Sequence, residues 1–359
     1  MKNIVVIMIL LMGAMMFPNI SATSQAKVSA NTVKKAVSSS SKLTVNTIES
    51  IKLKDVKYWA YQINGSYTDK EIKNIVDSKY DMVVLEPTRT STDELNYDAA
   101  AMVSRIKDSK ASDGKAGKLA IAYINIGEAE SWRWYWQKIS NPVNKYDIVL
   151  APDPDGWEDN YLTAFWKEKW KDIIIYGSET AKGLKFKSAI DQAITDGFDG
   201  IYLDWVEAYA EDKVIKRAQK DGVEPKKEMI KFLSQIRTYT KERNKDFLVI
   251  QQNASSIVAQ SNEAFDYIDA IAQEGVWFDG TAYDDWADPT ACDIRNNSAL
   301  TNYYLVNLKK FLKQGKPVFN IEYAEKYAKN AYEISRKNGY IPYCTRRALS
   351  KLSNTVPYR

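Results

Sequence analysis

Short apolar segments alternate along the chain with longer stretches in which apolar and polar residues follow a helical period. Apolar runs of four to eight residues are typical of strands that are covered on both faces, as in a parallel sheet. Eight such runs predict strands, at residues 56–63, 81–85, 118–124, 199–203, 247–250, 268–272, 317–321 and 340–343.

The amphipathic segments between these runs predict helices at residues 68–78, 184–195, 226–243, 300–313 and 324–338, with a further helix after Thr92. Thr68 and Glu71 have the spacing of a capping box, which marks a helix start. Eight strands that alternate with helices favour a single α/β domain, a (β/α)8 TIM barrel. An open doubly wound sheet is the alternative, but the chain lacks the glycine-rich phosphate loop of such sheets.

Two connections are much longer than the others. Residues 125–183 follow the third strand and residues 275–297 follow the sixth. Long loops in a compact domain are usually functional or disordered, and the first of these two carries six tryptophans. Because large aromatic side chains argue against disorder, we expect a folded, Trp-rich insertion between the third strand and the next helix of the barrel.

Acidic residues stand just past several of the predicted strands. Asp204 is the most distinctive, because the motif GFDGIYLD places it directly after a short apolar strand. In a barrel the C-terminal ends of all strands meet at one face, so these side chains are expected to converge there. The acids are Glu86, Glu128, Glu130, Asp204, Glu207, Glu274 and Glu322, and Tyr61, Gln62, Gln252 and Asn253 lie at comparable points.

The composition narrows the chemistry. Histidine is absent from the 359 residues, which excludes Ser-His-Asp and Cys-His catalysis and argues against a zinc hydrolase. The 50 basic and 46 acidic residues nearly balance, so no nucleic-acid partner is expected. No metal or cofactor is expected, and the protein is expected to be a monomer. Carboxylates and aromatic rings remain in quantity.

The N-terminal residues predict export. Residues 1–26 have the charged start (Lys2), apolar core and small-residue end of a signal peptide. Residues 27–50, rich in Ser, Thr and Lys, predict a flexible linker, and residues 51–359 the catalytic domain. The mature protein is then secreted or bound at the cell surface, without stable membrane insertion; a retained N-terminal anchor is the alternative.

Cys292 and Cys344 are the two cysteines of the chain. In an oxidising compartment they could form one disulfide bridge. Two separate thiols are an equally open interpretation, because the sequence does not give the distance between them.

Two carboxylates on either side of a glycosidic bond can catalyse its hydrolysis. Neighbouring negative charge and burial raise the pKa of a carboxyl, which suits one of the two to act as an acid. A cleft with so many carboxylates also favours a cationic ligand, such as a sugar that carries a free amine.

Several motifs together resemble the polygalactosaminidase-like barrels of glycoside hydrolase family 114. They are YINIGEAESWRWYW (residues 123–136), GFDGIYLDWVEAY (197–209), QQNA (251–254), QEGVW (273–277) and IEY (321–323). The resemblance implies a barrel that cleaves α-1,4-linked galactosamine polymers, with an acid after the fourth strand as nucleophile and one after the sixth as acid/base. On this chain these are Asp204 and Glu274.

The remaining residues of the set are expected to bind substrate. They are Tyr61, Gln62, Glu86, Tyr123, Glu128, Glu130, Glu207, Gln252, Asn253, Trp277, Glu322 and Tyr323. Glu322 or Glu128 is the alternative proton donor to Glu274. Two other functions stay open: a sugar-polymer-binding protein on a degenerate barrel, and a structural surface protein.

Overall fold

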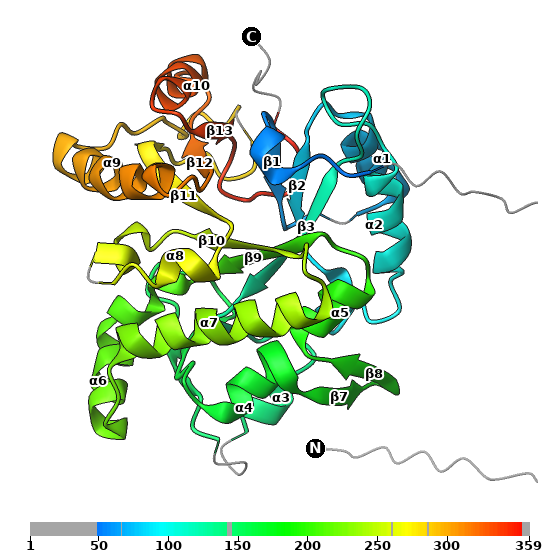
Figure 1. Ribbon diagram of the computed structural model, residues 1–359, viewed down its shortest axis with the longest axis vertical. Coiled ribbons are helices and arrows are strands. Elements are labelled where there is room, and N and C mark those ends of the chain that lie inside the picture. Colours follow the sequence, from blue (N-terminus) through cyan, green and yellow to red (C-terminus); the bar gives the residue numbers. More distant parts are fainter. Residues whose placement is uncertain (1–48, 66, 142–145, 260, 286, 354–359) are drawn as a thin grey trace, which may run out of the picture. The chain divides into compact units, whose positions relative to one another are not determined.

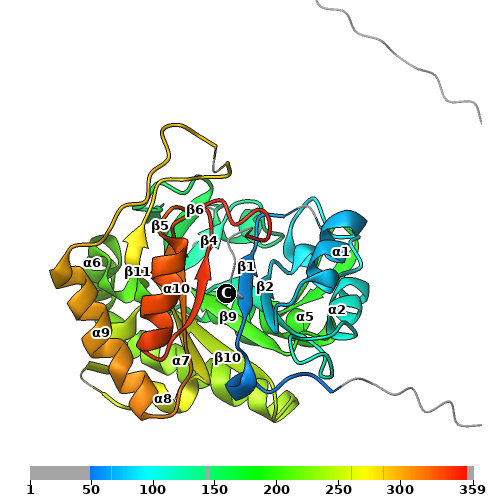
Figure 2. The same ribbon diagram turned by 90° about the horizontal axis from the view of Figure 1, so that it is seen from above.

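Eight parallel strands form a nearly closed barrel in the order β1-β2-β3-β9-β10-β11-β12-β13 (Figures 1 and 2). The computed structural model describes residues 49–65, 67–141, 146–259, 261–285 and 287–353. The strands are β1 (Trp59–Gln62), β2 (Met82–Leu85), β3 (Leu119–Asn125), β9 (Gly200–Asp204), β10 (Leu248–Gln252), β11 (Ala270–Asp279), β12 (Val318–Tyr323) and β13 (Ile341–Cys344). The expected (β/α)8 architecture is confirmed, and all eight predicted strands are present.

Helices connect the strands and cover the outside of the barrel (Figure 2). They are α1 (Asp69–Asp77), α2 (Ala99–Lys107), α5 (Ala189–Thr195), α6 (Asp212–Asp221), α7 (Pro225–Arg243), α8 (Ala264–Tyr267), α9 (Ser298–Lys313) and α10 (Ala328–Lys337). The capping box of α1 is formed, because the Thr68 side chain accepts from the Glu71 N–H and the Glu71 carboxylate accepts from the Thr68 N–H.

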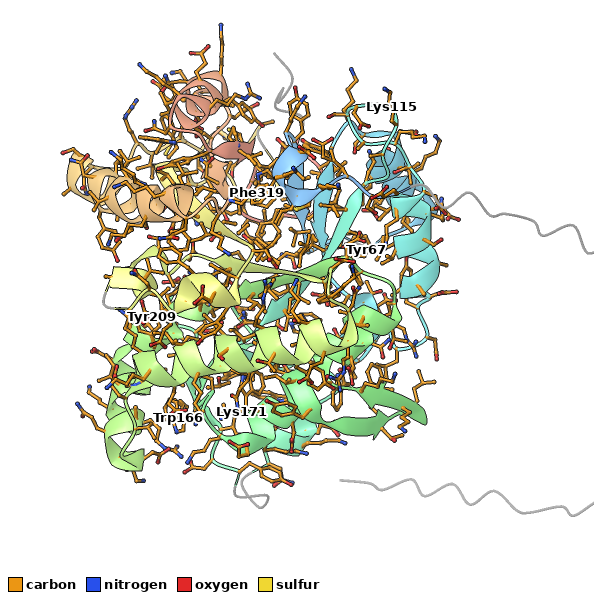
Figure 3. The ribbon with its side chains drawn as sticks, in the orientation of Figure 1. Tyr67, Lys115, Trp166, Lys171, Tyr209 and Phe319 are labelled. Carbon is orange, nitrogen blue, oxygen red and sulfur yellow. The ribbon has the colours of Figure 1, made fainter. Side chains whose placement is uncertain are left out.

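Aromatic side chains fill the barrel. Trp59 on β1 packs against Phe319 on β12 (ring centroids 5.2 Å apart), which lies between the strands in Figure 3. The Trp59 Nε1–H also donates to the Ile341 carbonyl on β13 (2.8 Å) and so links the first strand to the last. Further toward the C-terminal ends, Tyr61 packs against Tyr202 at 5.0 Å. The aromatic core therefore reaches the C-terminal ends of the strands.

The long connection after β3 is folded, as expected. It contains a three-stranded antiparallel sheet in the order β4-β6-β5, two short helices, a π-helical turn and a β-hairpin. Their bounds are β4 (Glu128–Glu130), α3 (Trp136–Ile139), β5 (Val149–Pro152), β6 (Asn160–Thr163), α4 (Glu168–Lys171), η5 (Asp172–Tyr176), β7 (Ser178–Ala181) and β8 (Leu184–Lys187). Trp170 is fully buried and donates to the Ile126 carbonyl (2.8 Å), which ties the insertion to the end of β3.

The helix predicted at residues 184–195 is wrong in its first turn. Residues Leu184–Lys187 form β8, which pairs with β7, and the helix begins at Ala189 after the N-cap residue Ser188. The alternation Leu-Lys-Phe-Lys has the period of a strand, with Phe186 buried and its two lysine neighbours exposed.

The predicted signal peptide (residues 1–26) lies outside the described residues, as does the linker (27–50) except for its last two residues. Ser50 already pairs with Gly117 in a parallel bridge. No helix in the described part of the chain is long and apolar enough to cross a membrane.

Candidate active site

Asp204 lies at the C-terminal end of β9. Trp205, the next residue, has a left-handed backbone (φ 55°), and its N–H donates to Asp204 Oδ1 (2.8 Å). The Tyr123 hydroxyl on β3 donates to Asp204 Oδ2 (2.5 Å). Burial raises the pKa of Asp204 to about 7; the hydrogen bond from Tyr123 lowers it, and the Glu274 carboxylate nearby raises it. The carboxyl group is therefore fixed in place and changes its charge near neutral pH.

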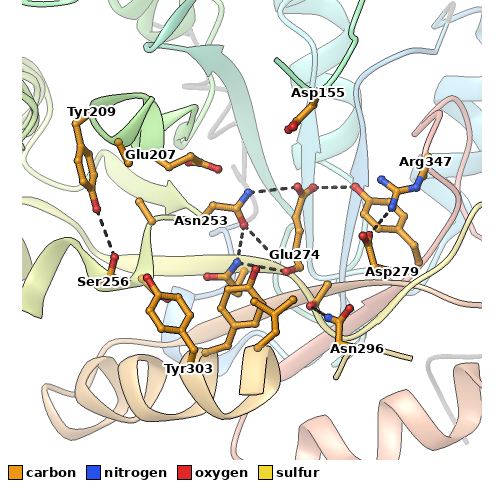
Figure 4. A pocket seen from close by; sticks show the side chains of 18 residues that line it. Asp155, Glu207, Tyr209, Asn253, Ser256, Glu274, Asp279, Asn296, Tyr303 and Arg347 are labelled. Carbon is orange, nitrogen blue, oxygen red and sulfur yellow. Dashed lines mark hydrogen bonds and ion pairs between the residues drawn. The ribbon is translucent and has the colours of Figure 1, made fainter. Parts of the chain in front are cut away.

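Glu274 lies on β11 within the electrostatic reach of Asp204. Its Oε1 accepts from the Tyr323 hydroxyl (2.9 Å) and its Oε2 from Asn253 Nδ2 (3.4 Å). Burial raises the pKa of Glu274, and the bonds from Tyr323 and Asn253 lower it. Figure 4 shows Glu274 beside Asn253.

Asn253 is oriented by its own hydrogen bonds. Its Oδ1 accepts from Gln273 Nε2 (2.9 Å) and from the Glu274 N–H (3.0 Å), so the Nδ2 group is turned toward the carboxylate. Asn253 follows β10 in a left-handed conformation (φ 50°), which turns the chain at this point. Because both amide ends have partners, this residue fixes the side chain of Glu274.

A cleft with two lobes runs over these strand ends. The Asp204 lobe, about 310 Å³, is lined by Asp204 and by aromatic side chains that include Tyr61, Tyr123, Trp132, Trp157 and Tyr283. The α9 lobe, about 420 Å³, is lined by Asn296, Tyr303 and Tyr304 among others (Figure 4). Six residues line both lobes: Asp155, Glu207, Asn253, Glu274, Tyr323 and Arg347. Glu274 thus stands at the border between the lobes.

Glu207 is a third carboxyl close to the pair. It lies on the 3-10 helix η6 (Val206–Ala210) and points toward the middle of the cleft in Figure 4. Burial, followed by the charge of Asp204, raises the pKa of Glu207 to about 8. A cation bound between the lobes would face this carboxyl as well as Asp204 and Glu274.

Two further acids of the cleft are already paired with a buried arginine. Arg133 Nη2 donates to Glu86 Oε2 (2.9 Å) and Arg133 Nε to Glu130 Oε2 (2.6 Å). Burial raises the pKa of Glu86 to about 7 even though Arg133 lowers it. Glu86 and Glu130 line the Asp204 lobe, but the guanidinium between them neutralises much of their charge.

Ten of the fourteen expected site residues line the cleft. They are Tyr61, Glu86, Tyr123, Glu130, Asp204, Glu207, Gln252, Asn253, Glu274 and Tyr323. Gln62, Glu128, Trp277 and Glu322 line neither lobe.

Glu322 and Trp277 lie on the outer side of the barrel, because β12 and β11 are longer than the sequence predicts. β12 continues through Tyr323, so Tyr323 and Glu322 face opposite sides of the strand. Glu322 is fully buried and accepts from the N–H groups of Val276 (3.1 Å), Trp277 (3.0 Å) and Phe278 (2.7 Å). The Trp277 Nε1–H donates to Ser335 Oγ on α10 (2.9 Å). Their expected role in substrate binding is therefore corrected to a structural one.

Glu128 and Gln62 are also buried away from the cleft. Glu128 Oε2 accepts from Asn125 Nδ2 and Asn160 Nδ2, both at 3.4 Å. Burial, and next the charge of Asp153, raises the pKa of Glu128 to about 10. Gln62 lies against the backbone of Gly65. Neither side chain is placed to contact a ligand in the cleft.

The two cysteines are not bonded to each other. Cys344 is buried at the end of β13, where its Sγ lies 3.7 Å from the Ala328 carbonyl, whereas Cys292 is exposed in the connection after β11. Of the two interpretations, the structure agrees with two separate thiols and not with a disulfide bridge.

Arg347 is one of the cleft residues that the sequence does not predict; Asp155, Trp157 and Tyr283 are others. Arg347 follows β13, stacks over the Tyr323 ring at 4.7 Å, pairs with Asp279 and donates to the Gly280 carbonyl (2.7 Å). It lies four residues past the eighth predicted strand (340–343), whereas Asp204 directly follows the fourth, so its place in the sequence marks it less clearly.

An eight-stranded barrel with two tyrosine-bound carboxyls in an aromatic cleft defines the class of protein, a glycoside hydrolase of the TIM-barrel type. The chain belongs to glycoside hydrolase family GH114, whose sequence model matches residues 40–358. The resemblance seen in the motifs and the expected enzyme class are both confirmed.

Curated relatives cover most of the chain. An uncharacterised protein of Deinococcus radiodurans is 28% identical over 307 residues, 85% of each chain. One of Thermotoga maritima is 26% identical over 304 residues, 81% of each.

Two solved structures share the fold. The glycoside hydrolase domain of PelA from Pseudomonas aeruginosa has a TM-score of 0.54 at 13% identity and covers 83% of this chain and 100% of that domain. Aspergillus fumigatus Ega3, solved in complex with galactosamine, has a TM-score of 0.54 at 14% identity and covers 85% of this chain and 98% of that one.

Proposed function

We propose that this protein is an exported hydrolase that cleaves an amine-bearing sugar polymer, such as α-1,4-linked galactosamine, by a retaining two-carboxylate mechanism. The observation that carries the proposal is the pair Asp204 and Glu274. Both line one cavity, each is held by a tyrosine hydroxyl, and each has a raised pKa.

In this mechanism Asp204 attacks the anomeric carbon while Glu274 protonates the leaving oxygen. Glu274 then removes a proton from the water that hydrolyses the glycosyl–Asp204 ester. The hydrogen bonds support this division of roles. Asp204 accepts two close bonds, from Tyr123 and from the Trp205 N–H, and such bonds favour the anion. Glu274 accepts one close bond, from Tyr323.

The reaction needs a carboxyl that still carries a proton, and the raised pKa values of the cleft carboxyls favour their protonated forms. The Glu274 carboxylate raises the pKa of Asp204, and both of these carboxylates raise the pKa of Glu207. An ammonium group next to Asp204 favours its ionised form. A cationic sugar would therefore help to ionise the nucleophile.

The charge of the cleft supports an amine-bearing substrate. Arg347 is the arginine that lines the described cleft, and it is paired with Asp279; Arg133, behind Glu86 and Glu130, is paired with both of them. Asp155 and Glu158 add carboxyl groups beside the catalytic pair, and Glu207, whose pKa burial raises to about 8, is ionised more readily when a cation lies next to it. We assign Glu207 to the sugar ammonium group, because it borders both lobes next to Asp204. Ega3 was solved with galactosamine, which agrees with this assignment.

The test uses mature protein and galactosamine oligomers, and follows new reducing ends. Asp204→Asn and Glu274→Gln should each lower kcat by several orders of magnitude, whereas Tyr176→Phe, at a residue that lines neither lobe, should not change it. A dinitrophenyl glycoside needs no acid for its leaving group, so Glu274→Gln should still release dinitrophenol quickly in the first step, with slow turnover afterwards because the second step lacks its base, and Asp204→Asn should show no such fast release. Equal loss in both variants contradicts the division of roles, and an inverted product contradicts retention.

A polymer-binding protein with a catalytically inactive barrel would retard the polymer in a gel and release no reducing ends. For export, the support is the sequence of residues 1–26. Mass spectrometry of the extracellular protein should find an N-terminus close to residue 27, and a full-length protein in the membrane fraction contradicts cleavage.

A further inference from the structure

Two aromatic rings from the two long connections meet at the mouth of the Asp204 lobe. Trp157 comes from the turn between β5 and β6, and Tyr283 from the connection between β11 and α9. Their ring centroids are 6.5 Å apart and the planes are tilted by 35°. Both rings line the lobe that contains Asp204.

These rings are unusually exposed for their size. Trp157 is 40% exposed and Tyr283 58%, while Tyr61 and Tyr123, deeper in the same lobe, are 1% and 5% exposed. Large apolar groups that stay in water at the mouth of a cleft mark a surface that meets a ligand. The pair therefore lies outward of the catalytic carboxyls, along the same cavity.

The backbone on each side holds its ring in position. The Trp157 N–H donates to Asp153 Oδ1 (3.0 Å), and Ser131 Oγ donates to Asp159 Oδ1 (2.7 Å) at the end of the same turn. On the other side, the Arg347 N–H donates to the Ala282 carbonyl and the Ala348 N–H to the Tyr283 carbonyl, both at 3.0 Å. Because both backbones are fixed, binding a ligand on the rings costs little ordering entropy.

We propose that Trp157 and Tyr283 form an aromatic platform that binds a pyranose ring of the polymer, at a subsite outward of the sugar attacked by Asp204. The apolar C–H face of a pyranose covers aromatic rings, and the edge of an amine-bearing sugar can place its ammonium over them. Glu158, which follows Trp157 in the chain and lines the same lobe, supplies the matching negative charge. This platform rests on the proposed function, since it requires a polymer in the cleft.

The platform predicts a dependence on chain length. In Trp157→Ala and in Tyr283→Ala, KM for galactosamine oligomers of five or more sugars should rise about fivefold to tenfold with kcat nearly unchanged, as expected for a lost stacking contact. A dinitrophenyl monosaccharide does not reach the platform, so its kcat/KM should stay at the wild-type value. The double variant should resemble the single ones, because the rings act together. Trp157→Phe should keep most of the affinity.

Tyr176→Ala is the matched control. Tyr176 is 45% exposed, packs against Tyr239 and lines neither lobe. Its replacement by alanine should therefore leave KM and kcat unchanged for every substrate. Equal losses on short and long substrates in Trp157→Ala would overturn the platform in favour of a structural role, and unchanged KM on long oligomers would also overturn it.

Affinity electrophoresis separates this proposal from the proposed function. The Asp204→Asn variant should be retarded by galactosamine polymer, and the Asp204→Asn/Trp157→Ala variant should be retarded less. If the wild type cleaves no such polymer but retardation still depends on Trp157, the catalytic proposal fails and the platform stands. If the polymer retards neither variant, the platform is refuted as well.

Discussion

Replacement of Glu128 by glutamine should stabilise the protein at neutral pH. Glu128 is fully buried, and burial together with the charge of Asp153 raises its pKa to about 10. The carboxyl is therefore protonated in the folded state at pH 7, while in the unfolded chain it titrates near 4.5 and is ionised. Folding at pH 7 must bind a proton.

The hydrogen bonds show why glutamine fits. Oε2 of Glu128 accepts from two asparagine amides, at Asn125 and Asn160, and Asp153 Oδ1 accepts from the Trp157 N–H. This leaves Glu128 Oε1 and Asp153 Oδ2, both buried and without another hydrogen-bond partner in the described part of the chain. A side-chain hydrogen bond with Asp153 is one cause of the raised pKa of Glu128, so we expect the protonated carboxyl to donate to Asp153. A glutamine amide would donate from the same place and accept at the other end.

The size of the effect follows from the pKa difference. A group whose pKa is raised on folding contributes stability that is complete below its unfolded pKa and is lost as the pH rises toward its folded pKa. Between pH 4.5 and pH 7 the loss is about 1.4 kcal/mol per pH unit, or about 3 kcal/mol. Glutamine loses none of it, so Glu128→Gln should raise the free energy of unfolding by about 1–3 kcal/mol at pH 7.

Urea unfolding at pH 4, 7 and 9 measures this. The advantage of Glu128→Gln should be near zero at pH 4, present at pH 7 and larger at pH 9. Glu128→Ala is the control: it removes the donor to Asp153 and the acceptor of two amides, and should destabilise by about 2–4 kcal/mol at pH 4 and less at pH 7. If Glu128→Gln is less stable than the wild type at pH 7, the carboxyl is ionised in the fold and this reasoning is refuted.

Three further outcomes are expected. In Tyr123→Phe, Asp204 loses a bond that lowers its pKa, so the acid limb of kcat/KM should move to higher pH by about one unit; an unmoved limb contradicts the nucleophile assignment. In Tyr323→Phe, the pKa of Glu274 should rise in the same way, and the alkaline limb of kcat/KM should move to higher pH while the acid limb moves less. The Lys118 ammonium group donates to the carbonyls of Ser78 (2.6 Å), Tyr80 (2.9 Å) and Lys110 (2.6 Å), and Lys118→Met leaves all three without this donor. Thermal unfolding should therefore show a free energy of unfolding that is lower by about 2–4 kcal/mol. Lys115 is exposed, so Lys115→Met should show no such loss.

The barrel could be predicted from the sequence because its signal is local. A strand buried on both faces is a continuous apolar run, and each of the eight runs became a strand. The segment Leu184–Lys187 shows the limit of this approach. Its period-2 alternation and the N-cap serine that follows were both present in the sequence, but the predicted helix was extended through them. The three-stranded sheet of the insertion depends on pairing between distant segments, which a local pattern does not reveal.

The site could be predicted where the alternation along the strand turns the residue after the apolar run toward the cleft. Asp204 is the last residue of β9, and it lines the cleft as expected. Glu322 was assigned one residue past a strand that in fact continues, and alternation along β12 turned it to the opposite face from Tyr323. The side of the strand that a residue faces therefore decides whether it lines the cleft, and a short distance from the predicted strand end does not.

The buried carboxyls of this barrel favour stability when they are protonated, whereas the proposed activity needs one of them ionised. Burial is the first cause of the raised pKa at Glu86, Asp204, Glu207 and Glu322, which reach about 7, 7, 8 and 8. Each of them holds its proton more tightly in the folded chain than in the unfolded one, so each lowers stability as the pH rises from about 4.5 toward neutrality. The proposed mechanism, however, needs Asp204 ionised. A cationic substrate resolves the conflict for the residues that face the cleft, because its charge favours their ionised forms, but it cannot reach Glu322 on the outer side of β12. The acids of the cleft and the acids of the scaffold therefore respond to the same pH change in the same direction, and only the first group responds to substrate.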